Sequence, residues 1–273
     1  LVILISSIDS IQFAAHELYG APFIAAVMIA FVMWSIRDKP KRVFAFLVSL
    51  PLIFVIAWLF GNSLGYDSTD ILGASLSRGQ IGMVVLLPAL MAVPATFSLM
   101  RENSEKKKIP FFAHFIHLGL VLLVIGHIMS TTIIDRGTYE HSVTLIKDEK
   151  VEWGGYEFEF VDVVTETEGL EVGDGYLGAV INVYEDGELI DTVEPGVIRF
   201  DSRARSEVDR VTTWHGDIVL IMDGTQARSL MEGSDLVRIM VYDLPGIHLV
   251  WGGWSLMLLA SLAIWAPRRH PTD

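Results

Sequence analysis

The sequence predicts a polytopic α-helical membrane protein of about five transmembrane helices, with an extracytoplasmic all-β domain inserted before the last helix. Two observations predict this fold class. The 273 residues are 52% hydrophobic with a mean hydropathy of +0.47, which is more apolar than an ordinary soluble domain. The acidic residues behind the net charge of −13 are concentrated between residues 133 and 244, whereas the rest of the chain is slightly basic. This uneven composition predicts two environments for one chain, and its acidic balance argues against nucleic-acid binding.

The transmembrane helices are predicted from apolar stretches of sufficient length. A helix needs roughly 20 apolar residues to cross a bilayer. The stretches that meet this requirement are residues 18–36, 43–61, 80–100, 110–131 and 245–266. They divide the chain into a transmembrane helical region (1–131), an acidic domain (132–244), and a last helix with a short tail (245–273).

The orientation follows from the basic residues between the spans, which fall on alternate loops. The three clusters are Arg37, Lys39, Lys41 and Arg42; Arg101, Lys106, Lys107 and Lys108; and Arg268 and Arg269. Loops rich in Lys and Arg stay in the cytoplasm. We therefore expect the N-terminus and the acidic domain to lie outside, and the C-terminus to lie in the cytoplasm.

The acidic domain alternates apolar and polar residues with the period of a β-strand. The clearest runs are residues 156–164, 179–187, 217–222 and 236–242, and Gly-containing turn signals separate them. Asp186-Gly187, between Glu185 and Glu188, is the clearest hairpin turn. Short, evenly spaced strands favour a small β-sandwich or an open barrel.

Several classes of chemistry are excluded by the sequence. The chain has no cysteine, so it has no disulfide framework, no thiolate chemistry of its own and no Cys-based zinc or iron–sulfur site. It carries no GxSxG, HExxH, P-loop or Rossmann fingerprint. It begins with Leu1, and its first residues are typical of the tail of an apolar helix, so we expect a fragment or a subunit whose beginning is missing.

The stretch before the acidic domain carries His114, His117 and His127. An ionisable residue inside a spanning helix is costly and usually faces a bundle interior or a cofactor, and imidazole is a common ligand of heme iron. His117 lies roughly 10 Å of helical rise from Pro110, and His114 lies one turn nearer the cytoplasm, within about 60° of the same face. We expect His127 to meet interfacial water. The alternative is a structural role, in which a histidine bonds a neighbouring helix or reaches the interface.

Gly119, beside His117, would let either a flat macrocycle or another helix come close to this part of the span.

The remaining histidines have simpler interpretations. His16 stands where the first span meets the outside, so it is either a candidate outer-side heme ligand or a polar interface residue. His248 precedes two tryptophans and fits an interfacial aromatic belt. The histidines expected at the surface are His141, His215 and His270.

Four segments together carry a resemblance to a known family. They are HLGLVLLVIG (117–126), PGIHLVWGG (245–253), APRRH (266–270) and DSIQFAAHELYGAPF (9–23). With the β-domain between the first two, they resemble the C-terminal part of the CcmF family, the heme lyase of the system I cytochrome c maturation apparatus. The resemblance spans nearly the whole chain, and the order, spacing and topology of the segments carry it.

The resemblance implies a b-type heme in the membrane, with His117 as an axial ligand of its iron. The partner histidine lies in the family's N-terminal half, which this chain lacks. His114 is a further candidate on the same helix. The family also binds the delivered heme through outward-side histidines. A gapless match puts Gln12 at one of these positions, whereas His16 lies one helical turn further on and would reach the same place in a different helical register.

The resemblance implies a component of the heme lyase in the inner or plasma membrane, rather than a self-contained enzyme. Apocytochrome thiols add to the vinyl groups of heme at the outer face, while the membrane heme at His117 passes electrons. The implied partners are a CcmE-like heme chaperone, apocytochrome c, thiol-handling maturation proteins and the N-terminal half that carries the WWD loop. Only residues 102–108 link the third and fourth spans, where fuller members have additional helices; we expect a compact, split or archaeal-like variant, or an incomplete sequence.

Two other functions stay open at this stage. One is a heme-free membrane scaffold that docks maturation partners through the β-domain. The other is a sensor or transporter subunit, for which the sequence offers neither a cytoplasmic output domain nor paired half-repeats.

Overall fold

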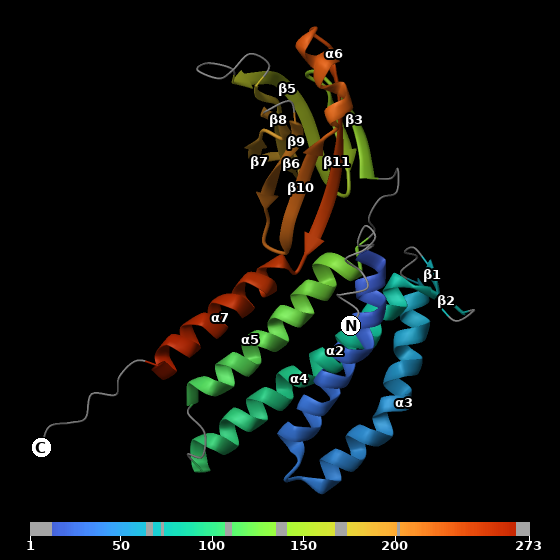
Figure 1. The fold of residues 1–273 in the computed structure, drawn as a ribbon, viewed down its shortest axis with the longest axis vertical. Helices are drawn as coiled ribbons and strands as arrows, with labels where there is room; N and C mark the ends of the chain where they lie inside the picture. The colour runs from blue at the N-terminus through green and yellow to red at the C-terminus, as the bar shows by residue number, and fades with distance from the viewer. Residues whose placement is uncertain are drawn as a thin grey trace, which may run out of the picture. The chain divides into compact units, whose positions relative to one another are not determined.

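The computed structural model describes residues 13–63, 68–71, 74–106, 111–134, 141–166, 174–200 and 203–265. The chain divides into two compact units, drawn in Figure 1. The helical unit comprises Leu1–Asp135 and Gly246–Asp273, and the β unit comprises Arg136–Pro245. This combination of apolar helices and a separate all-β region confirms the predicted fold class.

The helical unit is built from long apolar helices. They are α2 (Phe13–Ile36), α3 (Pro40–Ser63), α4 (Arg78–Lys106), α5 (Phe111–His127) and α7 (Ile247–Trp265). The π-helix η1 (Ile128–Thr132) continues α5, and the short strands β1 (Ser68–Ile71) and β2 (Ala74–Ser77) join α3 to α4. Among the described residues, four segments are long and apolar enough to cross a membrane: Pro40–Asn62, Arg78–Glu102, Phe111–Thr132 and Ile247–Trp265. The apolar part of α2, Gly20–Ile36, is shorter.

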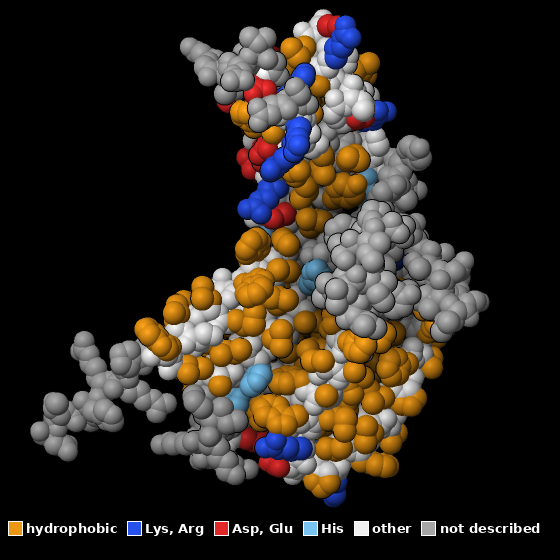
Figure 2. Space-filling view, viewed as in Figure 1, with side chains coloured by type: hydrophobic (Ala, Val, Ile, Leu, Met, Phe, Trp, Pro, Cys, Tyr) orange, Lys and Arg blue, Asp and Glu red, His pale blue; other side chains and the backbone are white. Residues whose placement is uncertain are grey.

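The helices carry small side chains inside and large apolar side chains outside. Ala57, Ala89 and Ala92 are completely buried, whereas Phe44 and Leu52 are 70% and 61% exposed. Figure 2 shows hydrophobic side chains over much of the described surface of this unit. Inside a bilayer the hydrophobic effect does not drive helices together, so helices associate through close packing, which small residues allow. The pattern therefore suits a bundle surrounded by lipid.

A reciprocal pair of hydrogen bonds fixes the start of α4. The Ser77 hydroxyl accepts from the backbone N–H of Gln80 at 3.0 Å, and the Gln80 side-chain oxygen accepts from the backbone N–H of Ser77 at 3.0 Å. This is a capping box, which satisfies two backbone donors at a helix N-terminus. Ser77 and Gln80 also donate to the carbonyls of Gly61 and Trp58 in α3. The same residues therefore begin one helix and attach it to the end of another.

Helices α5 and α7 pack backbone to backbone through glycines. A Cβ added to Gly119 would lie 2.7 Å from the carbonyl oxygen of Gly253, and one added to Gly253 would lie 2.5 Å from the carbonyl oxygen of Gly119. Seven residues further along α5, Gly126 packs in the same way against the start of α7, at the Gly246 carbonyl and the Val250 amide. No larger residue fits at these contacts without moving a helix.

The β unit is a strongly curved antiparallel sheet. Its strands are β3 (Ser142–Ile146), β4 (Lys150–Trp153), β5 (Tyr156–Glu166), β6 (Gly175–Glu185), β7 (Glu188–Val193), β8 (Gly196–Phe200), β9 (Arg203–Thr212), β10 (Gly216–Met222) and β11 (Leu236–Pro245). The strand order is β3-β11-β10-β9-β8-β6-β5-β4, with β7 also paired to β6. A short 3-10 turn, η3 (Gly224–Gln226), and the helix α6 (Ala227–Met231) link β10 to β11.

The two halves of the sheet enclose one apolar core. Strand β9 joins them, because its first half pairs with β8 and its second half pairs with β10. At the far ends, a bridge between Lys147 and Phe160 brings β3 next to β5. The core includes Phe158, Phe160 and Ile218, none of which is exposed. This arrangement agrees with the predicted small sandwich or open barrel.

The alternating runs identified in the sequence form β5, β6, β10 and β11. The predicted hairpin is confirmed, because Glu185 pairs with Glu188 across Asp186-Gly187. Both turn residues have positive φ, 52° and 81°, which a two-residue hairpin turn of this type requires. Strand β9 was not predicted, since its first half is exposed on both faces and therefore lacks an apolar period.

We predict that Gly253→Ala destabilises the helical unit, because its Cβ would collide with the backbone of α5. Gly252→Ala is the matched control, since a Cβ there meets no atom within 4 Å. Both changes gain the same helix propensity of about 1 kcal/mol, while overpacking at Gly253 costs about 1–3 kcal/mol. Thermal unfolding of the purified protein in detergent measures the difference. Equal melting temperatures for the two variants would contradict the close contact.

Candidate functional site

Two histidines of α5 lie close together at the end of the bundle where this helix begins. The ring centroids of His114 and His117 are 6.2 Å apart, as expected for side chains three residues apart on a helix. His114 is completely buried. Both of its ring nitrogens and the Nδ1 of His117 are buried without a hydrogen-bond partner among the described residues. An unsatisfied buried polar atom costs about 1–3 kcal/mol, so the pair is a candidate ligand site.

Helix α2 supplies two aromatic neighbours of His117. The ring centroids of Phe31 and Trp34 lie 5.4 and 5.6 Å from the His117 ring, and the two aromatic rings also contact each other at 5.9 Å. The Arg37 guanidinium lies 5.3 Å from the Trp34 ring centroid. These rings shield one side of the imidazole from water and restrict its rotation. Phe31 and Trp34 cannot be recognised in the sequence as neighbours of His117, because only the fold brings α2 to this part of α5.

The space beside Gly119 is occupied by a helix. The sequence allowed either a flat macrocycle or another helix to approach there, and α7 fills this position through Gly253 and Met257. Any ligand of His117 must therefore lie on another side of α5.

A polar link closes the same end of the bundle. Lys39, just before α3, forms an ion pair with Glu102 near the end of α4. The Lys39 ammonium also donates to the Ser98 hydroxyl at 3.1 Å, and this hydroxyl donates to Glu102 at 3.4 Å. These groups therefore join the start of α3 to the last turns of α4.

The other histidines on the helical unit contribute less to such a site. His127, at the end of α5, and His248, at the start of α7, are exposed. His16 lies in α2, but its side chain is outside the described residues, as are Gln12 and His270. The assignment of an outer-side ligand at His16 or Gln12 therefore stays a prediction from the sequence.

A second polar cluster lies in the β unit around His215. Its Nδ1 is 3.2 Å from the Thr213 hydroxyl, and its Nε2 is 3.4 Å from the Tyr156 hydroxyl and 3.7 Å from Oδ1 of Asp243. Among the described residues, this carboxylate oxygen is buried without a hydrogen-bond partner. Burial raises the pKa of Asp243, and the nearby His215 opposes the shift. The cluster joins the turn between β9 and β10 to the start of β5 and to the last residues of β11.

His215 and His141 are less exposed than the sequence suggested. The side chain of His215 is 26% exposed. His141 stacks on Tyr242 with ring centroids 5.0 Å apart, and its Nδ1 lies 3.0 Å from the carbonyl oxygen of Val241. Both had been expected at the surface because they stand in polar surroundings in the sequence. Strand pairing brings aromatic residues from distant positions to them, which local composition does not reveal.

We predict opposite pH effects for two aspartates of the β unit. Asp243→Asn should raise the free energy of unfolding at pH 7, because a folded-state pKa above the unfolded value means that ionised Asp243 costs stability. The gain should vanish as the pH falls below about 4, where the carboxyl is protonated in both states. Thermal unfolding in detergent across this range measures the gain.

Asp223→Asn provides the contrasting case. Hydrogen bonds from the Thr225 hydroxyl and amide, and then from Arg238, lower the pKa of Asp223. Its contribution to stability is therefore present at neutral pH and lost as the pH falls through the folded-state pKa, so this variant should be less stable at pH 7 and equal to the wild type in acid. If both variants changed the free energy of unfolding at pH 7 in the same direction, the opposite pKa shifts of Asp243 and Asp223 would be contradicted.

Comparison with known proteins finds one informative likeness. No protein-family model matches the sequence, and no curated protein matches it. Among solved structures, the fold is similar to that of the cytochrome c heme lyase CcmF, with a TM-score of 0.62. The two chains are 17% identical, and the match covers 94% of this chain and 41% of that chain. This chain thus has a CcmF-like fold and spans less than half of the solved protein.

Proposed function

We propose that this chain is a membrane component of the cytochrome c maturation heme lyase, which binds heme and takes part in its transfer to, and covalent attachment on, apocytochrome c. The observation that carries the proposal is the likeness of nearly the whole fold to a cytochrome c heme lyase. The histidine pair inside the apolar bundle adds a chemical argument, because imidazole is a common ligand of heme iron.

The proposed cofactor is a b-type heme, with His117 as an axial ligand of its iron. The donor set fits this group, because the buried Nδ1 of His117 lacks a hydrogen-bond partner in the described part of the chain and imidazole is a common axial ligand. Phe31 and Trp34 would orient the imidazole and exclude water. When bound, heme at this position would supply one-electron transfer. His114, one turn away, is the further candidate.

The proposed partners belong to the same machinery. They are a CcmE-like heme chaperone, apocytochrome c, thiol-handling maturation proteins and the N-terminal half of the lyase. The chain has no cysteine, so the thiols that add to the heme vinyl groups would come from the substrate. His16 stays the candidate ligand for the heme delivered from outside.

The spectrum of the membrane heme tests the ligand. The full-length protein, co-expressed with the other lyase components, should show a low-spin b-type spectrum in reduced-minus-oxidised difference measurements. His117→Ala should abolish this spectrum, whereas His127→Ala, an exposed histidine on the same helix, should retain it. Added imidazole should restore part of the spectrum in His117→Gly.

An unchanged spectrum in His117→Ala would refute His117 as the ligand, and loss in His114→Ala alone would transfer the role to His114. A heme-free wild-type protein that still co-purifies with cytochrome maturation proteins would instead indicate the scaffold function.

The proposed orientation can be tested with single cysteines, because the natural sequence contains none. Glu188 and Lys41 are both exposed, and they lie in the β unit and in the first turn of α3, respectively. A membrane-impermeant maleimide added to intact spheroplasts should label Glu188→Cys. It should label Lys41→Cys only after lysis, since the positive-inside rule predicts a cytoplasmic loop there. The opposite labelling pattern would reverse the topology.

A further inference from the structure

The hairpin formed by β8 and β9 presents an unusual row of side chains on one face. Across the two strands, Phe200 pairs with Arg203, Ile198 with Arg205, and Gly196 with Glu207. Because side chains alternate along a strand, these residues share one face. Strand β8 therefore supplies an apolar row, and β9 supplies a row of charges in the order positive, positive, negative.

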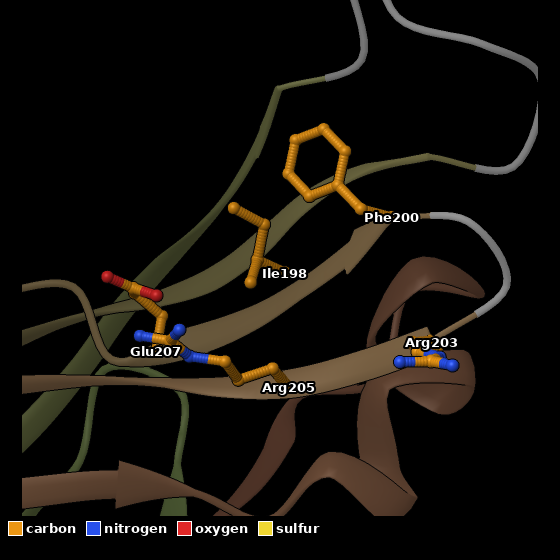
Figure 3. Close-up of a pocket in the computed structure, with 5 residues that line it drawn as sticks. All are labelled: Ile198, Phe200, Arg203, Arg205 and Glu207. Atoms are coloured by element: carbon orange, nitrogen blue, oxygen red, sulfur yellow. The ribbon is translucent and has the colours of Figure 1, made fainter.

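This face lines a cavity of about 790 Å³, bounded by Ile198, Phe200, Arg203, Arg205 and Glu207. Figure 3 shows the two apolar side chains rising from β8 and the three charged residues on the neighbouring strand. The volume lies in the range of ligand-binding pockets. The cavity can therefore hold several side chains of a bound partner.

One backbone edge of the same strand is available for pairing. Strand β10 pairs with β9 only from Val208 to Thr212, while β8 covers the other edge from Arg203 to Glu207. In the described part of the chain, no strand pairs with the second edge of Arg203–Glu207. Every residue from Arg203 to Val208 is exposed. An exposed edge of this kind is a template for an added strand.

This edge lies far from the end of β11 within the β unit. The register places Thr212 opposite Asp217 and Asp217 opposite Leu244, so the second half of β9 lies beside the end of β11. Arg203 and the start of β9 lie at the opposite end of the β unit.

We propose that the Arg203–Glu207 edge binds an extended segment of a partner protein by strand addition. On the cavity face, the Cβ atoms of the added strand would lie about 4.5–5.5 Å from those of Arg203, Arg205 and Glu207. Complementarity then requires an acidic residue opposite each arginine and a basic residue opposite the glutamate. The partner segment therefore carries charges at alternate positions, in the order acidic, acidic, basic along β9.

A second copy of this chain fits the edge less well. If two copies of the edge paired antiparallel, Arg203 would face Glu207 twice, but the two Arg205 side chains would face each other. Like charges directly opposite one another destabilise a strand pair. The central arginine thus selects a partner with a carboxylate at this position.

Peptide binding to the whole chain in detergent tests the proposal. The probes are fluorescein-labelled TEVEVKT and TKVEVET, which present the required charges in the two strand directions, each compared with its charge-reversed counterpart by fluorescence polarisation. We expect one direction to bind about tenfold more tightly than its charge-reversed counterpart at low salt. Arg203→Glu combined with Arg205→Glu should reverse this preference, while Arg199→Glu, on the other face of the hairpin, should leave it unchanged. N-methylation of the bound peptide's backbone should weaken its binding.

The outcomes separate the proposal from its rivals. Absence of peptide binding, equal binding of a peptide and its charge-reversed form, or an equal effect of Arg199→Glu would overturn it. Unchanged affinity after N-methylation would leave only side-chain capture and reject strand addition. Light scattering across a concentration series reports self-association, and a dimer altered by Arg205→Glu would assign the edge to a second copy instead. Thermal unfolding of each variant confirms that the β unit is folded.

Discussion

The backbone contact between α5 and α7 is the constraint on which the architecture depends. The two helices are far apart in the sequence, and the whole β unit lies between them. For a domain to be inserted without disturbing its host, the two ends of the insertion must lie close together. Gly126 provides this closeness within the helical unit, because the absence of a side chain lets the Gly246 carbonyl approach. Gly119 and Gly253 extend the contact along both helices, so the helix before the insertion and the helix after it form one paired element.

The same contact restricts where a cofactor can lie. The Gly119 side of α5 is filled by α7, and Phe31 and Trp34 of α2 lie against the ring of His117. The imidazoles are therefore held between helices that differ in how tightly they pack. The pairing with α7 is fixed by backbone contact, which no side-chain rotation can open. The aromatic side can adjust by rotating side chains, so a ligand of His117 is more readily admitted towards α2 than towards α7.

The features that could be predicted from the sequence are those that produce a local hydrophobic period or a locally biased composition. Apolar stretches predicted the helices, although α2, α3 and α4 are longer than predicted. Helix α3, for example, begins at Pro40, whose fixed φ and missing N–H suit the first turn of a helix. Alternation predicted β5, β6, β10 and β11, which each bury one face. The first half of β9 has no buried face and therefore no apolar period. In the site, the positions of His114 and His117 on one helix could be read from spacing, but the aromatic neighbours come from another helix and depend on tertiary packing.

The charge distribution of the β unit favours recognition by short-range contacts. The unit carries a large excess of carboxylates, which would repel an acidic segment at long range. At physiological ionic strength, however, exposed charges are screened beyond about 8 Å, whereas paired side chains on neighbouring strands stand only about 5 Å apart. Arg203 and Arg205 therefore determine the interaction once a segment reaches the edge, while the surrounding carboxylates disfavour acidic segments elsewhere on the unit. An acidic domain with one cationic edge thus discriminates by position, because the same partner is repelled by most of the surface and accepted where two arginines face it.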